Sequence, residues 1–74
     1  MARKYPTMKA REYLELIDKL GLTQEQAGDF LGFTGRSSRR WIAGVAIPPL
    51  VAIMLRYMVR EKLTPQDIRP EWDQ

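Results

Sequence analysis

The chain has 74 residues, with 12 lysines and arginines against 9 aspartates and glutamates, and a formal net charge of +3. It contains no cysteine and no histidine, which excludes disulfide bonds, Cys/His metal sites and the side chains that most often serve as thiol nucleophile or general base. The length suits one small domain held by packing, and no apolar run reaches the ~18 residues that a transmembrane helix needs.

The first seven residues (1–7) form a predicted basic arm that carries Arg3 and Lys4, and Pro6 limits any helix there. The arm lacks the apolar segment of a secretory signal, so we expect a soluble cytoplasmic protein with no membrane partner. Apolar residues at helical spacing follow directly and predict a compact all-α domain of four to five helices over residues 8–68. Residues 69–74 form a predicted tail, which we expect to be frayed apart from Trp72.

The first predicted helix covers residues 8–20, and Thr7 is its expected N-cap. Apolar residues recur on this helix at the spacing of one buried face, and the opposite face is charged. The apolar face consists of Tyr13, Leu16, Ile17 and Leu20. Gly21 follows, which is typical of a helix C-terminus.

Two short helices are predicted next, over residues 23–31 and 35–43. Thr23 and Gln26 have the spacing of a capping box, and Thr34 is the expected N-cap of the second helix. Gly28 lies inside the first helix, where glycine costs about 1 kcal/mol relative to alanine. We therefore expect another helix to approach closely at Gly28.

The helix over 35–43 divides into two faces, because each residue advances about 100° around the axis. Its three arginines lie on one side, and Ser38, Trp41 and Ile42 lie on the other, which predicts an inward anchor beneath a cationic outer face. Ser38 then places a hydroxyl in the core, and we expect that hydroxyl to bond to a helical carbonyl such as that of Thr34.

Positive charge is concentrated in the second half of the chain. No acidic residue occurs between Asp29 and Glu61, an interval that contains five arginines: Arg36, Arg39, Arg40, Arg56 and Arg60. The three arginines on the helix over 35–43 also have no carboxylate three or four residues away, unlike a solubilising face of mixed charge. This distribution favours a nucleic-acid partner over a merely solvated surface.

Arginine has the planar fork that matches guanine O6 and N7 in the major groove. Arg36 and Arg40, one turn apart near the centre of the cationic face, are the predicted base contacts. Predicted phosphate contacts come from the edge of this face and from the next helix: Arg39, Thr34, Ser37, Arg56 and Arg60. For Arg56 and Arg60, an ordinary solvated role is an equally good interpretation.

The fourth predicted helix covers residues 48–62 and is apolar on nearly every side. One apolar stripe suffices for the core, so the other needs cover, either from Ile68 and Trp72 in the C-terminal segment or from a second subunit. We favour a homodimer, with Leu50, Ile53, Tyr57 and Trp72 as candidate interface residues. Thr64 and Pro65 predict one further turn over residues 65–68.

The segment LGLTQEQAGDFLGFTGRSSRRWIAGVAIPP resembles the Cro and lambda-repressor type of helix-turn-helix, often called XRE-like. The matching positions are Leu20, Leu22, Thr23, Gln24, Leu31, Gly32, Thr34, Trp41, Gly44 and Pro48. The resemblance implies a lambda-repressor-like fold, a recognition helix over 35–43 and phosphate contacts at Gln24 and Thr23. The sequence departs from the pattern at Gly28, where alanine is usual, at Ser38, where a core valine or isoleucine is usual, and at Gly35, where relatives often carry a base reader.

These observations predict a sequence-specific regulator that binds double-stranded DNA, with a small repressor or autoregulator as the leading interpretation. The alternative is a helix-turn-helix interaction module, such as an antitoxin that binds a protein partner and its own promoter. We expect neither a cofactor nor a bound metal. An enzyme is not expected, because Ser37 and Ser38 have no neighbouring base and the carboxylates are scattered over solvated faces.

Overall fold

The computed structural model describes residues 5–72, which form five helices and no strand. The helices are α1 (Ala10–Lys19), α2 (Gln24–Phe30), α3 (Gly35–Ile42), α4 (Pro49–Arg60) and α5 (Pro65–Ile68). The predicted all-α class and the count of four to five helices are confirmed for this part of the chain. None of these helices is both long and apolar enough to cross a bilayer. Arg3 and Lys4 of the predicted basic arm lie outside the described residues.

The starts of α2 and α3 are encoded locally. The Oγ1 of Thr23 accepts from the backbone N–H of Gln26 at 3.1 Å, and the Gln26 side chain accepts from the N–H of Thr23 at 2.9 Å. The Oγ1 of Thr34 accepts from the N–H of Ser37 at 3.2 Å. The predicted capping box and the predicted Thr34 cap are therefore confirmed, since each bond satisfies an amide that the helix leaves without a partner.

The predicted start of the first helix is wrong. The helix begins at Ala10, and Lys9 occupies the N-cap position without a capping side chain. Thr7 contributes its carbonyl oxygen instead, which accepts a hydrogen bond from Nη2 of Arg56. Met8 is buried in the core, so the chain enters the domain as an extended segment pinned to α4 before it turns into α1.

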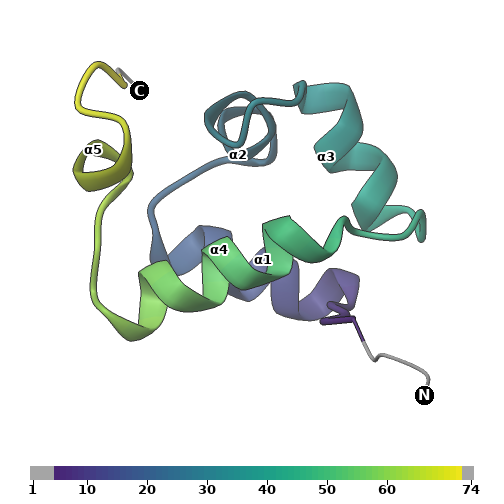
Figure 1. Ribbon diagram of the computed structural model, residues 1–74. Coiled ribbons are helices and arrows are strands. Elements are labelled where there is room, and N and C mark those ends of the chain that lie inside the picture. The colour runs from purple at the N-terminus through teal and green to yellow at the C-terminus, as the bar shows by residue number, and fades with distance from the viewer. Residues whose placement is uncertain (1–4, 73–74) are drawn as a thin grey trace.

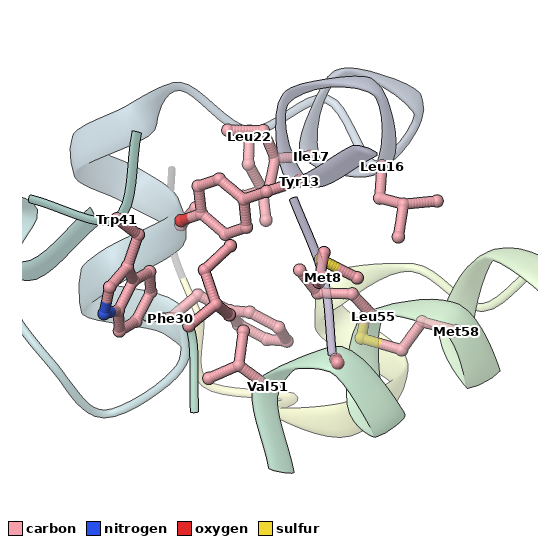
Figure 2. Packing of buried hydrophobic residues seen from close by; sticks show 13 residues of the cluster. Met8, Tyr13, Leu16, Ile17, Leu22, Phe30, Trp41, Val51, Leu55 and Met58 are labelled. Carbon is pink, nitrogen blue, oxygen red and sulfur yellow. The ribbon is translucent and has the colours of Figure 1, made fainter. Parts of the chain in front are cut away.

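α1 packs against α4, and α2 packs against α3 on the other side of the core (Figure 1). Apolar side chains from α1 to α4, together with residues of the segments that precede α1, α2 and α4, fill the space between these pairs (Figure 2). The buried set is Met8, Tyr13, Leu16, Ile17, Leu22, Ala27, Phe30, Trp41, Ile47, Val51, Ala52, Leu55 and Met58. α3 is thus attached on one side only, and its other side faces solvent.

The C-terminal segment is held against α2 rather than frayed. The indole of Trp72 meets the ring of Phe30 edge-on at a centroid distance of 5.6 Å. The Nη1 of Arg69 donates to the carbonyls of Asp29 and Phe30 at 3.1 and 3.0 Å, at the last turn of α2, and its guanidinium lies 5.2 Å from the Trp72 ring. Trp72 therefore packs against α2 within its own protomer, and its role as a dimer contact stays a prediction.

Candidate nucleic-acid interface

The two faces of α3 are divided as the helical spacing predicts. Ser38 and Trp41 are buried, whereas Arg36, Arg39 and Arg40 are exposed. The Trp41 ring meets Tyr13 edge-on at 5.5 Å and Phe33 at 5.1 Å. An aromatic anchor thus fixes the inner side of α3 while the outer side presents three guanidinium groups.

The Ser38 hydroxyl has a partner on another helix, which corrects the predicted bond to Thr34. Its Oγ lies 2.5 Å from the hydroxyl oxygen of Tyr13 on α1, and both side chains are fully buried. Burial raises the pKa of Tyr13, and the hydrogen bond between Tyr13 and Ser38 opposes that shift. The Ser38 hydroxyl is thus satisfied across the core by the Tyr13 phenol, as buried polar groups generally require.

Gly28 lies where α2 meets the turn into α3, and the expected close approach is confirmed. A Cβ on Gly28 would lie 2.1 Å from the carbonyl oxygen of Thr34. No side chain can replace that hydrogen without moving backbone, since 2.1 Å is far inside van der Waals contact. The glycine therefore sets the spacing between α2 and the start of α3.

Gly35, at the first turn of α3, lies against the side chain of Glu25 on α2. A Cβ on Gly35 would lie 2.9 Å from Cγ of Glu25 and 3.1 Å from its Cα and Cβ. The carboxylate then reaches α3, where Oε1 of Glu25 accepts from Nη1 of Arg39 at 2.7 Å. The sequence offers no sign of this ion pair, because its members are 14 residues apart on different helices.

The remaining arginines of the basic interval also differ in their partners. Arg56 donates two hydrogen bonds of 2.8 Å to the carboxylate of Glu12, and this contact lowers the pKa of Glu12 and raises that of Arg56. Arg56 thus ties α4 to α1. Arg60 bonds to Glu61 at 3.1 Å and lies over the Tyr57 ring.

Arg36 and Arg40 differ from the other three arginines of this interval, which each have a carboxylate partner. Across residues 5–72, neither side chain makes an ion pair or a hydrogen bond. Both are exposed on the outer side of α3. Thr23 and Gln24 are exposed at the start of α2, and the Thr34 and Ser37 hydroxyls lie 3.4 Å apart at the start of α3.

The outer side of α4 is exposed and apolar. The exposed fractions of Leu50, Ile53 and Tyr57 are 69%, 51% and 46%, so the C-terminal segment does not cover this stripe. An apolar groove of about 150 Å³ adjoins it, between α4, the end of α2 and α5. Its lining is Phe30, Leu31, Phe33, Leu50, Val51, Met54 and Ile68.

Comparisons of the chain with protein-family models, curated proteins and solved structures found no match.

Proposed function

We propose that this protein is a sequence-specific DNA-binding transcriptional regulator, acting as a small repressor or autoregulator with a lambda-repressor-like fold. One observation carries the proposal: among the five arginines between Asp29 and Glu61, only Arg36 and Arg40 have no carboxylate partner among residues 5–72. They lie one turn apart on the exposed side of a helix whose opposite side is anchored by Trp41. Free guanidinium groups on such a helix suit the O6 and N7 atoms of guanine in the major groove.

The neutral polar groups around α3 complete the proposed interface. Gln24 and Thr23 at the start of α2, with Thr34 and Ser37 at the start of α3, contact phosphates and set the orientation of the recognition helix. The resemblance supports the phosphate contact of Gln24. Arg56 and Arg60 are left out of this interface because Glu12 and Glu61 already bind them.

We further propose a homodimer in which the outer side of α4 packs against its counterpart in a second copy. Leu50, Ile53 and Tyr57 present no charge, so two copies of this stripe can meet without burying an unpaired ion. A symmetric dimer would offer two recognition helices to two half-sites of one operator. A monomeric mass at tens of micromolar would contradict the dimer and favour the alternative in which this apolar stripe binds a different protein, as in an antitoxin.

The experiment that tests the proposed function is selection of binding sites from random duplex DNA at fixed salt. We expect an enriched palindromic site, with affinity that falls as salt rises by a log–log slope of about −0.9 per neutralised phosphate. Replacing Arg36 or Arg40 by alanine should then cost about 1–3 kcal/mol on the selected site and relax the base preference at one position. An equal loss on random DNA would contradict base reading, and no enrichment would contradict the function.

A further inference from the structure

The three arginines on the outer side of α3 are not equivalent, although they share one face. Arg36 and Arg40 have no ionic partner among the described residues, whereas Arg39 is bound by Glu25 from the preceding helix at 2.7 Å. The exposed fractions of the two side chains are 52% for Arg39 and 73% for Glu25. Solvent and any approaching anion can therefore reach this ion pair.

The position of Glu25 is built into the packing of α2 on α3. Its stem occupies the space beside Gly35, where a Cβ would come within 2.9 Å of Cγ. Arg39 is four residues beyond Gly35 and so lies above it on the same side of α3. The glycine makes room for the glutamate stem, and the stem directs the carboxylate to the arginine.

A carboxylate and a phosphate compete for the same guanidinium donors. Sequence-independent affinity for DNA grows with the number of cations that neutralise phosphates and release counterions. An arginine bound by a carboxylate adds no net charge to the face, so Glu25 reduces the charge available to the phosphate backbone. Glu25 forms no ion pair or hydrogen bond with Arg36 or Arg40 among the described residues.

We propose that Glu25 limits the sequence-independent part of DNA affinity by holding Arg39 in an intramolecular ion pair and away from the phosphates. This inference depends on the proposed DNA-binding function. In this proposal Glu25 lowers the affinity for DNA, whereas its neighbour Gln24 raises it by contacting a phosphate.

The test is Glu25→Gln in the full chain, measured on a random duplex over a series of salt concentrations. Glutamine keeps the stem beside Gly35 and removes the charge. We expect affinity to rise about three- to tenfold at 0.15 M salt, with a log–log salt slope steeper by about 0.9. The matched control is Glu15→Gln, which removes one exposed carboxylate from α1 that has no ion pair within residues 5–72.

A second variant tests whether the gain in affinity of Glu25→Gln depends on Arg39. Arg39→Gln should cancel the gain in the Glu25→Gln background, because the guanidinium that Glu25 holds in the natural chain is then absent. An unchanged slope in Glu25→Gln, or an equal change in Glu15→Gln, would overturn the inference while leaving DNA binding intact. Failure of the natural chain to bind any duplex would overturn the proposed function as well. In that case a double-mutant cycle of Glu25 and Arg39 on the melting temperature would still report whether the two side chains are coupled.

Discussion

The outer sides of α3 and α4 expose opposite chemistry, although both helices bury their other side in the same core. α3 presents Arg36 and Arg40 without a carboxylate partner among the described residues. α4 presents Leu50 and Ile53, with exposed fractions of 69% and 51%. A hydrated guanidinium group gains from a polyanion, and an exposed aliphatic side chain gains from another apolar surface.

Because the charged and the apolar surface lie on separate helices, one small domain keeps two kinds of exposed surface apart. On α4, the charged side chain of Arg56 forms an ion pair with Glu12 of α1 and so stabilises the contact between these two helices. On α3, the aromatic side chain of Trp41 likewise packs inside the protomer, against Tyr13. Substitutions can therefore break one outer face while leaving the other unchanged.

The largest expected effect comes from Trp41→Ala, which removes the anchor that displays the cationic face. The indole is 5% exposed and meets both Tyr13 and Phe33 edge-on. We expect a loss of about 3–5 kcal/mol in the free energy of unfolding, measured by urea titration. Phe33→Ala is the control, because Phe33 touches the same indole but is 42% exposed, and it should lose less. Equal stability of Trp41→Ala and the natural chain would show that α3 is not held by this anchor.

The sequence predicts the starts of α2 and α3 and the two faces of α3 because these depend on residues close together in the chain. Thr23 with Gln26 and Thr34 with Ser37 satisfy amides three residues away. The crowding at Gly28 was also predictable, since glycine inside a helix is unfavourable without a packing reason.

The contacts that the sequence could not reveal join residues far apart in the chain. Tyr13 binds Ser38 across 25 positions, and Arg69 binds the Phe30 carbonyl across 39. The start of α1 was missed for the same reason, because Arg56 engages the Thr7 carbonyl from 49 positions away. Such bonds require knowledge of which helices pack together, and residue type alone cannot supply it.

The apolar face of α4 can be broken alone by the double variant Leu50→Gln/Ile53→Gln. Both side chains are exposed, so the protomer should remain folded and its affinity for random DNA should be retained. We expect loss of the dimer by analytical ultracentrifugation and about hundredfold weaker binding to a two-half-site operator, because the second half-site then binds independently. Leu14→Gln on α1 is the control, since Leu14 is exposed outside this face. A dimer that survives the double variant would place the interface elsewhere.

The smallest expected effect tests how α3 is positioned, through Tyr13→Phe. The variant leaves the buried Ser38 hydroxyl without its partner, and we expect a loss of about 1–2 kcal/mol in unfolding free energy near pH 7. Adding Ser38→Ala should recover part of this loss, because no buried polar group then remains unsatisfied at this contact.

Tyr13→Phe should also change how the free energy of unfolding depends on pH in alkaline solution. Burial raises the pKa of Tyr13 in the folded state above the value of about 10 expected for an unfolded chain. The buried neutral phenol therefore makes its full contribution to the free energy of unfolding below pH ~10. This contribution is lost as the pH rises from there through the folded-state pKa of Tyr13. Urea titrations from pH 9 to 11 should show a steeper loss for the natural chain than for Tyr13→Phe, with the exposed Tyr57→Phe as control. Identical alkaline slopes would show that the Tyr13 phenol is not held neutral beneath α3. In either case the α4 dimer should be unchanged, since Tyr13 lies beneath the cationic face and not the apolar one.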